Sequence, residues 1–316
     1  MLFKERSKPK RLTALGALLN RLPNNHARFE EVSEEYRKRA AGFGGEQFFD
    51  KHIHEFRPSY PYALLHDICL RVNGIYFQID SLLITPSAIT VFEVKNLAGK
   101  IMVKSSPTQF IQVSQVESKV IQSPITELDR KEIFLQQWLK KKEIDLPIRG
   151  IVVFSFANEI LIDGVPARQI ICAQEVPILL YQTPLGQEIL SFKQIRRLAE
   201  EMVLEHQEYI PKPLTDLIGI SVNHILQGVA CPKCRQLGMI WLQGCWQCGH
   251  CGAVSRHAHH KLLDDWFLLI NNKITNRQFR EFSFIENVHV AKRLLRTSGL
   301  KKFGTTKDVY YQVFKE

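Results

Sequence analysis

The chain has 316 residues, of which 45% are hydrophobic, and this length predicts a principal domain with one or two smaller ones rather than a single core. No apolar run is long enough to span a bilayer, and the first residues, MLFKERSKPKRL, lack the apolar core of a signal peptide; we therefore expect a soluble, cytoplasmic protein without a membrane partner. The formal net charge of +10 is concentrated in residues 1–11 and 256–316, which suits a nucleic acid partner, although solvated basic tails are also common.

The first predicted element is a helix over residues 28–56, which follows a basic N-terminal segment, residues 1–27. The helical stretch is rich in helix formers but contains Gly42, Gly44 and Gly45. A glycine inside a helix costs about 1 kcal/mol relative to alanine. We therefore expect these glycines to allow a close approach of another part of the backbone.

Three β-rich runs come next, separated by Asn73-Gly74 and by Thr85-Pro86-Ser87. Asn-Gly between apolar alternations is a strong hairpin signal. We expect an antiparallel meander formed by residues 62–73, 74–84 and 88–97.

The remaining elements of this domain include weaker strands near 101–104 and 110–113 and a helix over 124–142 that begins at Pro124. The run IRGIVVFSF, residues 148–156, is typical of a strand buried on both faces, and residues 168–180 repeat that type more weakly. The α-β-β-β-α-β order predicts an α/β domain over residues 28–210, with a mixed sheet flanked by helices.

Three charged residues lie in the otherwise apolar second hairpin. A tight turn at Pro86 and Ser87 would place Asp80 opposite Glu93, with Cβ atoms roughly 5 Å apart, and Lys95 would project from the same face as Glu93. Two facing carboxylates repel, and a bound Mg²⁺ or Mn²⁺ ion would compensate for this repulsion and activate water toward a phosphodiester. Lys95 could hold a phosphate oxygen, orient the water or stabilise charge in the transition state. The alternative is a carboxylate–lysine pair on a solvated face.

The segments FGGEQFFDKHI, QIDSLLITPSAITVFEVKNLAGKI and SPITELDRKEIFLQQWL resemble the nuclease-related domain, NERD, of the PD-(D/E)xK nuclease superfamily, over residues 42–180. The resemblance implies a restriction-endonuclease-like fold, with Asp80 as a metal ligand and Glu93-Val94-Lys95 as the (D/E)xK element. It also implies that Glu46 assists metal binding. The family usually has Asn-Pro followed by a glutamine three residues beyond the proline, whereas this chain has Ser-Pro followed by Glu127.

Five of the seven cysteines lie between residues 231 and 251, and clustering of this kind in a cytosolic chain indicates metal rather than disulfides. A hairpin between two C-x-x-C pairs needs residues 245–247 for its returning strand, which leaves Cys245 spare. We therefore expect a structural zinc ribbon over residues 228–254. The expected zinc ligands are Cys231, Cys234, Cys248 and Cys251; the alternative ligands nearby are His250, His257, His259 and His260.

Residues 257–316 resemble a small winged helix-turn-helix, with a short helix, a break near 285–287, a second helix and a β-like tail. In that arrangement the second helix and the tail contact nucleic acid. The expected nucleic-acid-binding residues are Lys292, Arg293, Arg296, Lys301 and Lys302. The alternative is a helical hairpin that docks on another protein.

The leading hypothesis from the sequence is a Mg²⁺-dependent deoxyribonuclease, a phosphodiester hydrolase targeted by the zinc ribbon and the winged unit. The expected catalytic residues are Glu46, Asp80, Glu93 and Lys95, with Asp80 and Glu93 as the magnesium ligands. The first alternative is a nucleic-acid-binding or regulatory protein that keeps the nuclease fold without turnover. A purely structural zinc protein would explain the cysteines but not the charges in the hairpin. These features suit RNA as well as DNA, and they specify neither the mode of cleavage nor the oligomeric state.

Overall fold

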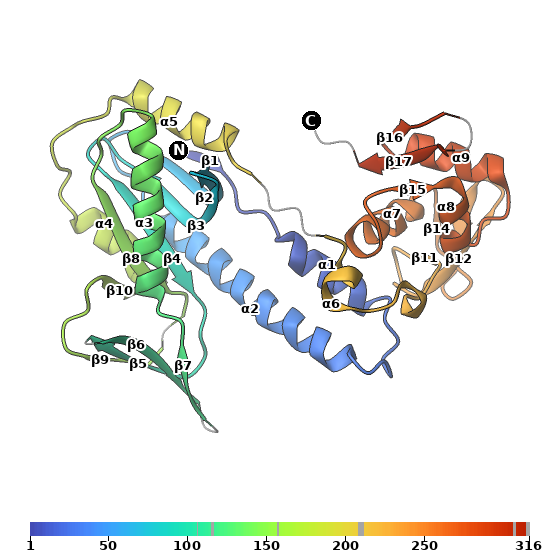
Figure 1. The fold of residues 1–316 in the computed structure, drawn as a ribbon, viewed down its shortest axis with the longest axis horizontal. Helices are drawn as coiled ribbons and strands as arrows, with labels where there is room; N and C mark the ends of the chain where they lie inside the picture. Colours follow the sequence, from blue (N-terminus) through green and yellow to red (C-terminus); the bar gives the residue numbers. More distant parts are fainter. Residues whose placement is uncertain (106, 115–116, 157, 208–211, 306–307, 314–316) are drawn as a thin grey trace. The chain divides into compact units, whose positions relative to one another are not determined.

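The computed structural model describes residues 1–105, 107–114, 117–156, 158–207, 212–305 and 308–313 (Figure 1). The chain divides into two compact units, and each combines two stretches of sequence. Unit 1 holds Met1–Lys8 and Arg39–Tyr209, and unit 2 holds Pro9–Lys38 and Ile210–Glu316. Among the described residues, no helix is both long and apolar enough to cross a lipid bilayer.

Unit 1 is built around a six-stranded mixed sheet with the order β1-β2-β3-β4-β8-β10. Strands β2, β3 and β4 are antiparallel neighbours, whereas the pairs β1–β2, β4–β8 and β8–β10 are parallel. The strands are β1 (Leu2–Lys4), β2 (Ala63–Val72), β3 (Ile75–Ile84), β4 (Ile89–Lys95), β8 (Ile148–Phe154) and β10 (Gln169–Cys172). The predicted α/β class with a mixed sheet and flanking helices is thus confirmed.

Helices cover both faces of this sheet. On one face, α3 (Pro124–Lys141) and α5 (Phe192–Leu204) share a hydrophobic core with the strands. On the other face, α2 (Phe29–Ile53) and α4 (Val176–Gln182) form a second core. Successive residues of β8 alternate between the two cores, which explains the continuous apolar run.

The two predicted turns of the meander are present. Asn73 and Gly74 both have positive φ angles, 50° and 84°, as a type I′ hairpin turn requires, and Val72 pairs with Ile75 around them. In the second turn, the Thr85 N–H donates to the Ala88 carbonyl oxygen at 2.9 Å.

A smaller sheet in unit 1 has the strand order β7-β6-β5-β9. Its strands are β5 (Lys100–Ser105), β6 (Thr108–Val113), β7 (Ser118–Ile121) and β9 (Ile160–Asp163). The two weaker strands expected from the sequence are β5 and β6, whereas β1, β7 and β9 were not predicted. The expectation for residues 168–180 was wrong in its second half: β10 ends at Cys172 and the helix α4 follows, with Pro177 in its first turn, where proline fits a helix.

Unit 2 contains the cysteine-rich segment and the C-terminal helices. Its helices are α1 (Lys10–Leu19), the first part of α2 up to Lys38, α6 (Leu214–Ile218), α7 (Ala258–Leu269), α8 (Asn276–Ser283) and α9 (Val288–Thr297). One sheet has the order β11-β12-β13-β14 and another the order β15-β17-β16. Their strands are β11 (Val229–Ala230), β12 (Leu237–Leu242), β13 (Cys245–Gln247), β14 (Val254–Ser255), β15 (Ile274–Thr275), β16 (Leu300–Phe303) and β17 (Tyr310–Val313). Single-turn 3-10 helices at Ala173–Glu175 and Val222–His224 complete the described elements of the chain.

A single hydrophobic core joins α1, the four-stranded cysteine-rich sheet and the C-terminal helices of unit 2. Arg21, just after α1, is fully buried and donates to Asp265 of α7 at 2.8 Å from Nε to Oδ2. The residues before Arg28 therefore do not form one separate basic segment: the first eight belong to unit 1 and the others to unit 2. Apolar positions such as Leu15 and Leu18 account for this, because they need a core to pack against.

Candidate active site

Helix α2 makes a close approach to the ends of β4 and β8 at Gly45. A Cβ atom at this position would lie 2.6 Å from Asn96 Cβ and 2.6 Å from Ser155 Oγ, so any larger residue would clash. Gly42 and Gly44 have nothing within 4 Å of such an atom, so the expected close approach holds for Gly45 alone. It brings the next residue, Glu46, against the sheet.

Asp80 lies at the point where the pairing of β3 with β4 ends. Ser81 and Phe92 are the last pair of this ladder. This is the register predicted from the sequence, and continuing it by one residue would place Asp80 opposite Glu93. Beyond this pair, Asp80 Oδ2 accepts a hydrogen bond from the Val94 N–H at 2.9 Å. The Asp80 carboxylate therefore binds a backbone group of β4, and its second oxygen, Oδ1, faces α3.

Glu93 and Asp80 bind the same cation, the ammonium group of Lys131 on α3. Lys131 Nζ lies 3.1 Å from Asp80 Oδ1 and also contacts Glu93 Oε2. The Glu93 side chain is only 2% exposed, so its charge is held away from water. Sequence reasoning missed Lys131, although a signal was present: it follows Glu127 by four residues, and residues with this spacing share one face of a helix.

Lys95 lies between two carboxylates. Its Nζ is 2.8 Å from Glu93 Oε1 and 2.6 Å from Glu127 Oε2. Glu127, which replaces the expected glutamine, is thus a partner of Lys95. The Lys95 side chain is 26% exposed, so its ammonium group borders solvent as well as the two acids.

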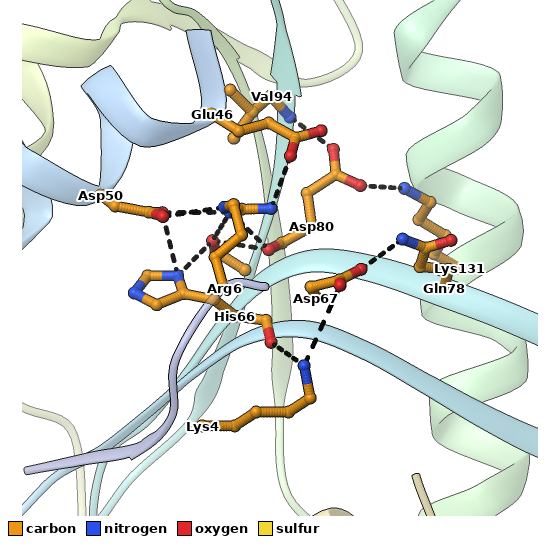
Figure 2. A network of polar contacts seen from close by, with 11 residues as sticks. Lys4, Arg6, Glu46, Asp50, His66, Asp67, Gln78, Asp80, Val94 and Lys131 are labelled. Carbon is orange, nitrogen blue, oxygen red and sulfur yellow. Dashed lines mark hydrogen bonds and ion pairs between the residues drawn. The ribbon is translucent and has the colours of Figure 1, made fainter. Parts of the chain in front are cut away.

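Glu46 belongs to a second group of contacts, centred on the buried side chain of Arg6 (Figure 2). Arg6 Nη1 donates to Glu46 Oε2 at 2.9 Å, its Nε donates to Asp50 Oδ2 at 2.8 Å, and its Nη2 donates to the Asp80 carbonyl oxygen at 2.8 Å. Figure 2 shows the carboxyl groups of Glu46 and Asp80 next to each other. Arg6 and Asp50 were not predicted as site residues. Asp50 follows Glu46 by four residues on the same helix, a spacing that indicates a shared face, whereas nothing in the local sequence marks Arg6.

His66 extends this group beneath Asp50. Its Nδ1 lies 3.1 Å from Asp50 Oδ1 and 2.8 Å from Ser81 Oγ, whereas its Nε2 is buried without a partner among the described residues. Burial and the nearby Arg6 charge lower the pKa of His66 to about 3. The imidazole is therefore neutral at physiological pH.

The acids of the site differ in proton affinity. Burial, with a further contribution from Asp80, raises the pKa of Glu93 to about 7, and burial likewise raises the pKa of Glu46 to about 7 despite the Arg6 charge. Burial also acts to raise the pKa of Asp80, but the Lys131 charge and the Val94 N–H outweigh it, so that pKa lies below its usual value. The carboxylates around Lys95 raise its pKa even though burial opposes this, so Lys95 stays charged.

The donor set of this site fits a divalent cation. Asp80 and Glu93 turn one oxygen each toward a common position, and that position already attracts the positive charge of Lys131. Mg²⁺ and Mn²⁺ prefer carboxylate oxygens and retain several waters. Asp80 and Glu93 would hold such an ion, with Glu46 close by.

Residues 41–155 match the family model described as nuclease-related domain, NERD. This part of the chain is similar to a nuclease-related domain. The matched range includes Glu46, Asp80, Glu93 and Lys95, as well as Lys131 and Glu127, which were not predicted as site residues. Arg6, by contrast, reaches the site from outside the NERD match. Neither the curated proteins nor the solved structures gave a match to the chain.

The cysteine cluster lies in unit 2, outside the NERD match. The Sγ atoms of Cys231, Cys234, Cys248 and Cys251 all lie within 4.8 Å of one another, whereas Cys245 Sγ contacts the Leu242 carbonyl oxygen. The pairs 231–251 and 234–248 have Sγ–Sγ distances of 3.7 and 3.6 Å. Four sulfurs at a Zn–S distance of about 2.3 Å in a tetrahedron would be about 3.8 Å apart. The donor set therefore fits zinc, as a zinc ribbon requires.

The two cysteine loops share one backbone pattern. The N–H of Cys231 donates to Gln236 O, and the N–H of Cys248 donates to Ala253 O, five residues on in both cases. Arg235 and Gly252 occupy equivalent positions with φ angles of 63° and 69°. The expected alternative histidines are not part of the sulfur cluster: His259 Nδ1, for example, accepts a hydrogen bond from Trp246 Nε1 at 3.1 Å.

The five predicted nucleic-acid-binding residues all lie in unit 2 and are all exposed. Lys292, Arg293 and Arg296 project from α9, and Lys301 and Lys302 lie on β16. The buried positions of α9, Ala291, Leu294 and Leu295, form its opposite face. Helix α9 therefore presents its basic residues to solvent.

Proposed function

We propose that the NERD domain is a metal-dependent nuclease that hydrolyses phosphodiester bonds of DNA. The observation that carries this proposal is the convergence of Asp80, Glu93 and Lys95 at one end of the β3–β4 hairpin, with two carboxylate oxygens directed at one cation position. Structural ion pairs are usually exposed, whereas this one involves an almost fully buried glutamate. Burying such a charge costs free energy, and strongly perturbed ionisable groups cluster at functional sites.

Asp80 and Glu93 are the proposed ligands of Mg²⁺ or Mn²⁺. A bound divalent ion would neutralise phosphate charge and lower the pKa of a water molecule. Glu93 must lose its proton to act as a ligand, and its pKa of about 7 allows this near neutral pH. Asp80 is already ionised under those conditions.

Lys95 is proposed to stabilise the negative charge of the phosphate rather than to remove a proton from water, because its raised pKa keeps it protonated. Glu127 positions Lys95 through the 2.6 Å contact. Glu46, with a pKa of about 7, is the better proton acceptor, since a general base works best when its pKa is close to the operating pH.

The proposed role of unit 2 is to recognise nucleic acid. Its zinc would be structural, because four thiolates leave no open coordination position. The α7–β15–α8–α9–β16–β17 order supports the proposal of a winged helix-turn-helix in residues 257–316, in which α9 would be the recognition helix and the β16–β17 hairpin the wing. The exposed basic residues on α9 and β16 would contact phosphates.

A second candidate function is nucleic acid binding without turnover. The observation that favours it is Lys131, whose ammonium group balances Asp80 and Glu93 without any metal. In that case the hairpin charges would be a structural ion-pair network. The two functions differ in one measurable property, which is cleavage.

The deciding experiment incubates the purified protein with circular DNA, linear DNA and RNA in the presence of Mg²⁺, Mn²⁺ or EDTA. We expect DNA cleavage with metal, none with EDTA, and a loss of about 100-fold or more in Asp80→Asn and Lys95→Ala. Asp145→Asn and Lys140→Ala make the same changes at exposed positions outside the site and should leave cleavage intact. Full activity of either site variant would eliminate this active site, and nucleic acid binding without cleavage would support the second candidate.

A further inference from the structure

Lys131 contacts the same carboxylate oxygens that a divalent ion would need as ligands. Asp80 Oδ2 already accepts from the Val94 N–H, and Glu93 Oε1 already contacts Lys95. The oxygens that remain, Asp80 Oδ1 and Glu93 Oε2, are the two that contact Lys131. A cation bridging both carboxylates through these oxygens would have to displace the Lys131 ammonium group.

The position of Lys131 makes such a displacement possible. Its side chain comes from α3, across from the strands that carry Asp80 and Glu93, and is 17% exposed. A lysine side chain has a flexible four-carbon stem, so the ammonium group can move toward solvent while α3 stays in place. Lys95, by comparison, has Glu127 as a second partner and keeps an ion pair if Glu93 turns to a metal.

The charge balance gives Lys131 a role before any metal binds. Asp80 and Glu93 are close together and largely buried, so without a counter-ion their repulsion would destabilise the end of the hairpin. Lys131 supplies that counter-ion from within the chain.

We propose that Lys131 is a built-in counter-ion that occupies the divalent cation position of the free protein and must leave when the ion binds. Lys131 thereby lowers the affinity for the metal and stabilises the metal-free site. This inference rests on the metal site of the proposed function, but it concerns cation binding and not cleavage.

The test measures Mg²⁺ and Mn²⁺ binding by calorimetry without nucleic acid, together with thermal unfolding in EDTA. We expect Lys131→Met to bind metal about tenfold tighter or more than the wild type and to unfold at a lower temperature in EDTA. Lys131→Arg keeps the positive charge and should bind metal as weakly as the wild type. Lys140→Met, on the exposed face of the same helix, should match the wild type in both measurements.

The outcomes separate this inference from the proposed function. Equal metal affinity of Lys131→Met and the wild type, or no metal binding by either, would overturn the counter-ion role. Tighter binding by Lys131→Met would support that role even if no variant cleaves nucleic acid, in which case only the proposed nuclease activity fails. A wild type that cleaves DNA with Mg²⁺ but has the same metal affinity as Lys131→Met would leave the nuclease standing and refute the role of Lys131.

Discussion

Replacing Gly45 by alanine tests the close approach of α2 to the sheet. Alanine inside a helix gains about 1 kcal/mol over glycine. At Gly45 this gain is opposed by contacts of 2.6 Å with Asn96 Cβ and Ser155 Oγ, and overpacking of this kind costs about 1 to 3 kcal/mol. The net change in the free energy of unfolding should thus be a loss of between about 0 and 2 kcal/mol.

Gly44→Ala is the matched control, because a Cβ atom at Gly44 meets nothing within 4 Å. It should stabilise the protein by about 1 kcal/mol, so the free energies of unfolding of the two variants should differ by about 1 to 3 kcal/mol. Thermal unfolding followed by circular dichroism should show the Gly45→Ala midpoint several degrees below that of Gly44→Ala. Equal midpoints would refute the close approach.

Three further changes test other parts of the structure. His66 has a pKa of about 3 when folded and 6.5 as its ordinary value, so between these pH values only the unfolded chain takes up this proton. The free energy of unfolding should therefore decrease as the pH is lowered through this range, by up to about 1.4 kcal/mol per pH unit. His66→Gln should make the stability measured between pH 6.5 and 5 depend less on pH. An unchanged slope would show that His66 is protonated in the folded protein. Metal analysis should find one zinc per chain, lost in Cys248→Ser and retained in Cys245→Ser, and the reverse would refute the sulfur cluster. A triple alanine variant on α9 should weaken DNA binding and reduce its salt slope by about 2 to 3, whereas an unchanged slope would mean that α9 does not contact DNA. That variant replaces Lys292, Arg293 and Arg296.

The hairpin was predictable because short turns determine strand register. Asn73-Gly74 and the turn after Thr85 each determine the register of the two strands that they connect. The register of the second hairpin places Asp80 and Glu93 at neighbouring positions. Likewise, the returning strand at residues 245–247 identified the cysteine left out of the cluster. Local rules of spacing and turn geometry were sufficient in both cases.

Contacts between residues far apart in the sequence could not be predicted from such rules. Arg6 reaches Asp50 from 44 residues away, and its neighbours in sequence suggest only a basic tail. Lys131 was predictable only in part. Helical spacing places it on the same face as Glu127, but its contacts with Asp80 and Glu93 depend on the packing of α3 on the sheet. Helix α4 was missed because a short apolar run fits a strand or a helix equally well.

The division of each unit into two stretches of sequence affects the order in which the protein can form during translation. Helix α1 leaves the ribosome with the first stretch of unit 2, but its core partners follow only after roughly 170 more residues, the span between Lys38 and Ile210. At a synthesis rate of about 5–20 residues per second this delay lasts about 10 to 30 seconds. During that time Leu15 and Leu18 have no completed core to enter, whereas all six strands of the large sheet of unit 1 are synthesised before Ile210. We therefore expect α1 to stay unpacked until the C-terminal residues emerge.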